Sequence, residues 1–168
     1  MRRIAIPIIF LALAALFETS LLPRLMTPGL RPNVVLIISA VWAALRGDEG
    51  LIWAFGAGLM LDFTSSGPFG LHTAGLILGN LLAGLINRLP LPSRLFRATN
   101  WVATTTAISQ IVLVVGLILS GIQMDLGYTL SALILPSLLI NPLVSMGVFA
   151  VLRLASDSID ERARGVIR

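Results

Sequence analysis

The part of the chain that most restricts its fold runs from Leu51 to Leu119 and contains a single acidic residue, Asp62. Long apolar runs make up most of this part, and the whole chain is 57% hydrophobic and only 12% charged. About a quarter of the residues are charged in an average soluble domain, so this chain has too few polar residues to cover its apolar ones in water. We therefore expect an integral membrane protein, in agreement with a mean hydropathy of +0.95.

Six apolar runs have lengths suited to membrane-spanning helices. They cover about residues 4–23, 32–45, 51–63, 70–87, 98–120 and 130–152. A helix rises about 1.5 Å per residue, so a run of about twenty residues reaches about 30 Å and crosses the hydrocarbon core. We expect an all-α integral membrane protein with six transmembrane helices, formed by a single polytopic domain over residues 1–168 that ends in a short cytoplasmic tail over residues 153–168.

The second and third runs are shorter, with about 13 residues each, or about 20 Å of helix. They are either full crossings that are tilted or extended by flanking residues, or a re-entrant hairpin that enters and leaves on one side. A hairpin would place Arg46, Asp48 and Glu49 deep in the bilayer, where each charge costs about 2.5–3.5 kcal/mol. We therefore favour full crossings.

The basic residues are distributed unequally between the two sides of this arrangement. All twelve are arginine, and only Arg24 and Arg31 fall on the side opposite the termini. The positive-inside rule then places both termini in the cytoplasm and the turn after Asp62 outside. Because the arginines lie at the ends of apolar runs, we interpret them as topology signals and expect no binding to nucleic acid.

Asp62 lies at the end of the third run, within the sequence AFGAGLMLDFTSSGPFGLH of residues 54–72. A carboxylate at such a position is retained for a reason, and two roles are open. As a structural brace, it would accept hydrogen bonds from the free backbone N–H groups at the start of the next helix, around residues 67–70. Alternatively, it would contact a ligand or carry a proton. We favour the brace.

Small residues form stripes on the third and fourth runs. Gly75, Gly79 and Ala83 repeat every four residues, and Ala54 and Gly58 have the same spacing. Such stripes let helix backbones approach closely. Because a short turn joins the two runs, we expect the stripes to pack face to face.

Three further polar residues in the apolar runs need partners. Glu18, near the outer end of the first run, either pairs with Arg24 or reaches the lipid headgroups. His72 is expected to be a hydrogen-bonded interface residue rather than a metal ligand. Asn141 lies near the middle of the sixth run and must bind another group, and Pro142 after it is expected to kink the helix.

The sequence contains no pattern typical of an enzyme or a metal site. It has no cysteine and one histidine, and it lacks a glycine-rich nucleotide loop, a Ser-His-Asp arrangement and a metal-spaced set of ligands. At 168 residues, and without a convincing internal repeat, it is small for an inverted-repeat transporter. We expect a non-enzymatic protein that uses no cofactor.

A series of short elements between residues 32 and 72 occurs in a specific order. They are Pro32-Asn33, Arg46-Gly47, Gly50, the glycines of AFGAGLMLD with its closing Asp62, and Gly67-Pro68-Phe69-Gly70-Leu71-His72. In these elements the chain resembles the MreD family of bacterial rod-shape-determining membrane proteins. Asn33 stands where the family usually has an acidic residue, and the second half of the chain matches only in hydropathy. The candidate structural or partner-contact residues are Pro32, Asn33, Arg46, Gly47, Gly50, Gly56, Gly58, Asp62, Gly67, Pro68, Gly70, Gly75 and Gly79.

The resemblance implies a non-catalytic scaffold in the bacterial inner membrane, within the elongation machinery (the elongasome) that builds side-wall peptidoglycan. The implied direct partner is MreC, a bitopic protein with a periplasmic coiled coil. Wider associates would be the glycosyltransferase RodA, its paired transpeptidase and the actin-like filament MreB, together with membrane lipid.

MreD proteins are also similar in architecture to the substrate-binding subunits of ECF-type vitamin transporters, which gives an alternative function. In that case the protein would bind a small molecule in an outward pocket near residues 64–66, Gln123 and Tyr128. Such subunits often dock their motor through an Ala-xxx-Ala stripe on the first helix. This stripe is missing here. The residues four positions after Ala12, Ala14 and Ala15 are not alanines but Leu16, Glu18 and Thr19.

Overall fold

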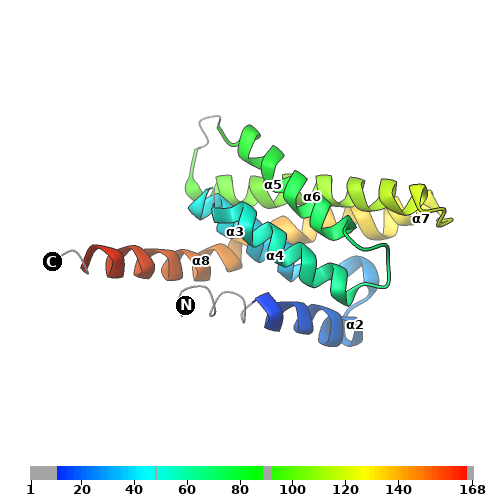
Figure 1. Ribbon diagram of the computed structural model, residues 1–168, viewed down its shortest axis with the longest axis horizontal. Coiled ribbons are helices and arrows are strands. Elements are labelled where there is room, and N and C mark those ends of the chain that lie inside the picture. Colours follow the sequence, from blue (N-terminus) through cyan, green and yellow to red (C-terminus); the bar gives the residue numbers. More distant parts are fainter. Residues whose placement is uncertain (1–10, 48, 89–91, 166–168) are drawn as a thin grey trace.

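The structure is a computed structural model that describes residues 11–47, 49–88 and 92–165 (Figure 1). Throughout these ranges the regular elements are helices, which confirms the expected all-α fold for this part of the chain. A helix over residues 11–16 continues as the π-helix η1 and then α2. The elements are η1 (Phe17–Leu21), α2 (Leu22–Leu25), the 3-10 turn η2 (Pro28–Leu30), α3 (Val34–Arg46), α4 (Glu49–Thr64), α5 (Leu71–Ile86), α6 (Arg94–Leu119), α7 (Leu126–Tyr128), the π-helix η3 (Thr129–Ile134) and α8 (Leu135–Gly165).

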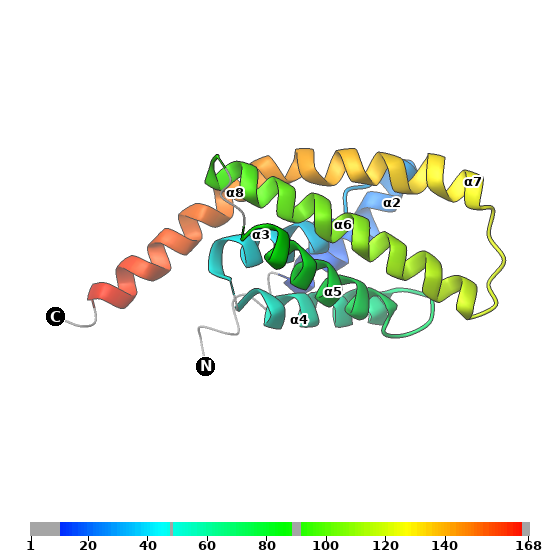
Figure 2. The same cartoon turned by 90° about the horizontal axis from the view of Figure 1, so that it is seen from above.

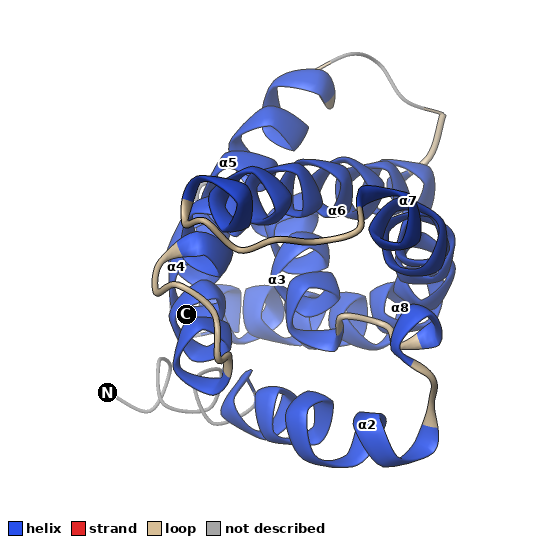
Figure 3. Cartoon of the chain, turned by 90° about the vertical axis from the view of Figure 1, so that its right-hand side faces the viewer, coloured by secondary structure: helices blue, strands red, loops and turns tan. Residues whose placement is uncertain are grey.

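Helix α3 is the centre of the bundle. Every residue from Val35 to Ala44 is buried, whereas a surface helix buries only one stripe. Helices α4, α6 and α8 pack against it, and the end-on view shows α3 within the bundle (Figure 3). The sequence allows this because α3 carries apolar and small residues around its whole circumference, with Ser39 as its only polar buried residue.

Two stretches of the described chain are long and apolar enough to cross a membrane, Arg94–Leu119 and Leu126–Leu154. Helices α3 and α5 are apolar but shorter. The outer faces of the bundle also carry large apolar side chains, such as Ile52, Leu139 and Val151, which are 75%, 75% and 63% exposed. A bundle with apolar residues on both its inner and outer faces is suited to a lipid environment.

The close approaches between helices differ from the expected pairing of small-residue stripes. A Cβ on Gly58 of α4 would collide with the backbone of Thr73 on α5. Gly75 and Gly79 instead face α6, where added Cβ atoms would lie 3.1 Å from Cα of Ser109 and 3.0 Å from Cα of Thr105. The stripes therefore do not meet face to face, because the small face of α5 is turned toward α6.

Helix α8 continues to Gly165, through most of the segment that we expected to be a tail. Its C-terminal part leaves the bundle at an angle to the preceding turns (Figure 2). Pro142 lies inside this helix and provides no N–H for a bond to the preceding turn. The π-helix η3 precedes Pro136, and local widening of this kind is one way in which a helix accommodates an interruption.

Candidate functional site

Asp62 is buried near the end of α4 and binds the first turn of α5. Its Oδ1 accepts hydrogen bonds from the backbone N–H of His72 at 3.0 Å and lies 3.0 Å from His72 Nδ1. Its Oδ2 accepts from the backbone N–H and the hydroxyl of Thr73, at 3.1 and 2.6 Å. The two amides belong to the group of helix-starting N–H donors that have no partner in their own helix. Asp62 thus acts as an N-terminal cap supplied by another helix.

The local geometry explains how this cap forms. Gly58 lies one turn before Asp62 and allows the α4 backbone to approach Thr73. Gly70 has a φ of +95°, a left-handed conformation that favours glycine and sets the entry into α5. The amides that bind Asp62 lie at residues 72 and 73, slightly beyond the expected 67–70. Both carboxylate oxygens are occupied by α5, an arrangement that favours the brace over a ligand contact.

The N-terminus of α3 is held in a similar way, by three residues that we call the α3 cap: Glu18, Asn33 and Asn141. The backbone N–H of Val35 donates to Glu18 Oε2 at 3.0 Å, and the N–H of Leu36 donates to Asn33 Oδ1 at 2.8 Å. An acceptor oxygen at this place satisfies a helix-starting N–H that has no partner in its own helix. Glu18 therefore has a different role from the two that we expected, which were pairing with Arg24 and reaching the headgroups.

Asn141 links the α3 cap to two other helices. Its Oδ1 accepts from the backbone N–H of Asn33 at 2.9 Å, and its Nδ2 donates to Oγ1 of Thr106 at 3.3 Å. The side chain is 1% exposed, so these bonds provide the partners that a buried amide requires. The Pro32-Asn33 element is thus the point at which α3, α6 and α8 are joined.

The α3–α4 turn contains Arg46, Gly47 and Gly50. Arg46 Nε lies 3.3 Å from Glu49 Oε2 in an exposed ion pair. Gly47 has a φ of +64° and ends α3, while a Cβ on Gly50 would collide with Ala43. These residues therefore shape the turn and the close α3–α4 contact.

The other motif residues lie nearer the surface. A Cβ on Gly56 would meet no atom within 4 Å, so this glycine makes no close packing contact within the bundle. Gly67 and Pro68 lie in the α4–α5 turn, and the Gly67 N–H donates to Ser65 Oγ at 3.1 Å. Beside this turn, Phe63 and Phe69 pack edge to face with ring centroids 5.2 Å apart.

A polar cavity of about 350 Å³ adjoins both capping sites. Its polar lining comes from helices that are distant in sequence and includes Glu18, Asn33, His72, Gln110, Ser137 and Asn141. Thr64 and Ser65, two residues of the expected outward pocket, also line it. In the sequence each of these polar residues lies within or beside an apolar run, but no pattern predicts that they line one common cavity.

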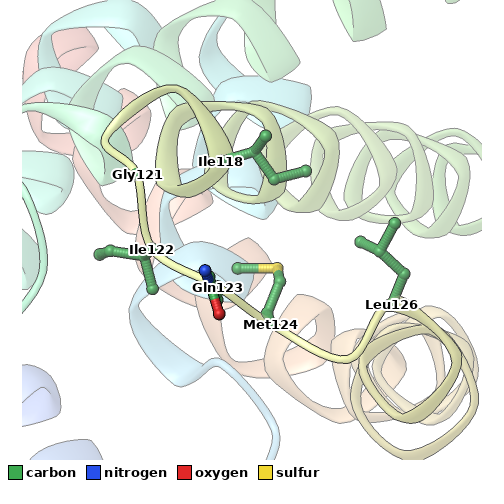
Figure 4. Close-up of a pocket in the computed structure, with 6 residues that line it drawn as sticks. All are labelled: Ile118, Gly121, Ile122, Gln123, Met124 and Leu126. Carbon is green, nitrogen blue, oxygen red and sulfur yellow. The ribbon is translucent and has the colours of Figure 1, made fainter.

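A second hollow of about 370 Å³ lies at the loop between α6 and α7 (Figure 4). Gln123 is its only polar side chain, and its other lining residues are Ile118, Gly121, Ile122, Met124 and Leu126. The residues of the expected outward pocket therefore do not share one cavity. Gln123 lines this second hollow, residues 64 and 65 line the polar cavity, and Tyr128 lines neither.

A family model described as rod shape-determining protein MreD matches residues 1–154. The chain belongs to the MreD family. No curated protein and no solved structure matches it. Membership in the MreD family implies a membrane protein with a role in rod-shape determination, from a family of structural rather than enzymatic proteins. In the described part of this MreD family member, no group of three or more acidic, histidine or cysteine side chains is placed to hold a metal ion.

Proposed function

We propose that the protein is a non-catalytic scaffold of the elongation machinery, which binds MreC and helps to organise side-wall peptidoglycan synthesis in the inner membrane. The observation that carries this proposal is the MreD family match over residues 1–154. The contacts of the motif residues support it. Asp62 and Asn33 bind helix ends, and Gly50 and Gly58 allow close helix packing, so these residues stabilise a bundle.

The proposed arrangement has six crossings with both termini in the cytoplasm. Ten of the twelve arginines then lie on the cytoplasmic side, as the positive-inside rule requires. The α4–α5 turn, with the exposed rings of Phe63 and Phe69, would lie at the outer surface. RodA, its paired transpeptidase and MreB would join the complex through MreC or beside it.

The outer face of α4 is the surface that we propose for the transmembrane helix of MreC. Gly75 and Gly79 are engaged with α6, so they are not available to a partner. Gly56 faces away from the bundle between Ile52 and Phe55, which are 75% and 50% exposed. A small residue flanked by large apolar ones lets a second helix approach closely within lipid.

Co-purification tests the scaffold proposal. The chain is expressed with the MreC protein of its own organism, one of the two is tagged, and the complex is run on size exclusion in mild detergent. A stoichiometric complex that survives dilution is expected. A chain that runs alone at all concentrations would contradict MreC binding.

The alternative is a small-molecule-binding subunit of an ECF-type transporter, and the polar cavity is the observation that favours it. The first helix argues against it, because Ala14 and Ala15 are buried within the bundle and do not form an exposed docking stripe. In the same experiment, this alternative predicts that the chain runs without MreC and gains thermal stability from a vitamin.

A further inference from the structure

The polar cavity lies where several helix ends converge. It is lined by Glu18 from the first helix, Asn33 at the start of α3, His72 at the start of α5 and Gln110 from α6. Its volume of about 350 Å³ is at the lower end of the range for small-molecule sites. Ligand sites commonly form between the helices of a bundle, where a few polar groups point into one space.

The N-terminus of α3 does not make this cavity an anion site. The N–H groups of Asn33, Val35 and Leu36 already donate to Asn141, Glu18 and Asn33 respectively. An anion entering here would meet the Glu18 carboxylate in place of free helix donors. The cavity therefore disfavours phosphate and carboxylate groups.

The ionisable lining residues Glu18 and Arg31 are both engaged in hydrogen bonds within the protein. Glu18 accepts the backbone N–H of Val35 at 3.0 Å. Arg31 is the second of these residues, and its guanidinium donates to the carbonyls of Met26 and Pro23 at 2.9 and 3.3 Å. Both of these side chains thus already have partners within the protein, so neither is a free site for an ion.

Two lining side chains retain hydrogen-bond acceptors. His72 Nδ1 lies 3.0 Å from the Asp62 carboxylate, so the neutral ring carries its proton on Nδ1 and has Nε2 as an acceptor. Gln110 donates through Nε2 to Ser137 Oγ at 3.2 Å, so its side-chain carbonyl oxygen remains an acceptor. A ligand that satisfies these two groups must supply hydrogen-bond donors.

We propose that the polar cavity binds an uncharged, hydroxyl-rich group of about the size of one sugar ring. Hydroxyl groups donate to His72 and Gln110, and Leu61 and Leu133 in the lining contact the apolar face of a ring. The group is either a free sugar or the headgroup of a glycolipid. This site is independent of MreC binding, because its lining lies apart from the outer face of α4 around Gly56.

The proposal is tested with the full-length protein in nanodiscs, prepared with a detergent that contains no sugar. The probes are free glucose, glucosyl diacylglycerol, inorganic phosphate and phosphatidylethanolamine. Binding is measured directly by native mass spectrometry and by the rise in thermal unfolding temperature that a native-state ligand produces. Binding of both glucose probes would show that the headgroup suffices, and binding of the glycolipid alone would identify a lipid source.

The variant Gln110→Met removes the acceptor at similar side-chain size. It is expected to weaken binding of the glucose probe by about 3–10-fold, the effect of one neutral hydrogen bond. Gln123→Met, at the second hollow, is the matched control and is expected to bind as the parent protein does. Thr64→Val is a second variant, at the exposed edge of the cavity. It provides the test if Gln110→Met does not fold. Three outcomes would overturn the proposal. They are no binding of either glucose or glucosyl diacylglycerol, equal binding of these probes by Gln110→Met and the parent protein, or tighter binding of phosphate or phosphatidylethanolamine than of the two glucose probes.

Discussion

Asp62 and Thr73 are joined by two hydrogen bonds, in which one carboxylate oxygen accepts from both the amide and the hydroxyl of the threonine, at 3.1 and 2.6 Å. The same carboxylate also binds His72 through its other oxygen. One acidic side chain of α4 therefore holds the first turn of α5 and thereby fixes the conformation of the α4–α5 turn.

The first prediction concerns this carboxylate. Asp62→Asn keeps the size of the side chain but replaces one acceptor oxygen with an N–H donor, which faces groups that themselves donate. We expect the free energy of unfolding to fall by about 1–3 kcal/mol, measured by denaturation in detergent. Asp125→Asn is the matched control, because Asp125 is exposed and caps only the short helix α7. A stable Asp62→Asn protein that fails to maintain rod shape would instead indicate a functional contact.

The second prediction separates charge from hydrogen bonding at Glu18. Glu18→Ala removes the acceptor for the Val35 N–H and is expected to destabilise the protein by about 1 kcal/mol, as the loss of a helix cap does. Glu18→Gln retains an acceptor oxygen and is expected to lose less. Equal stability of the alanine and parent proteins in thermal unfolding would show that Glu18 does not hold α3.

The third prediction compares two glycines of α4 that are two residues apart. Gly58→Leu forces a side chain into the backbone of Thr73 and is expected to reduce stability by about 1–3 kcal/mol or to prevent folding. Gly56→Leu points away from the bundle, so we expect normal unfolding but weaker co-purification with MreC. If Gly56→Leu retains MreC fully, the proposed partner surface lies elsewhere.

The fourth prediction concerns the link between α8 and α3. Asn141→Leu leaves the backbone N–H of Asn33 without its acceptor, and a buried donor without a partner costs about 1–3 kcal/mol. Asn87→Leu provides the comparison, because the Asn87 side chain donates only to Ala83 within its own helix. We expect a clear loss of thermal stability for the first variant and a small change for the second.

The sequence predicted helix ends best where a run meets a residue with a strong local preference, and it failed at the last run, where α8 continues to Gly165. Gly47 ends α3 and Ser93 caps α6 through the N–H of Phe96. It predicted less well which helices touch. The Gly75–Gly79 stripe identifies a face that needs a close neighbour, but α4 and α6 both pack against α5, and the periodicity does not distinguish them.

At the candidate site, too, the sequence predicted local contacts better than contacts between distant helices. Asp62 could be found from sequence, because a single carboxylate in a long apolar stretch needs a local partner and the next helix begins nearby. Glu18 and Asn141 could be recognised as polar residues in need of partners, but both partners lie on α3 or its cap, 17 and 108 residues away in sequence. Contacts over such distances depend on the packing of whole helices, which local patterns do not encode.

The burial of α3 has a consequence for how the protein is made. Its N-terminal cap includes Asn141, which leaves the ribosome 108 residues after Asn33. The segment with the family motif is therefore synthesised before the residue that completes the cap of its central helix. A chain that ends before Asn141 therefore lacks the acceptor for the Asn33 N–H, and its central helix is incomplete at the N-terminal end.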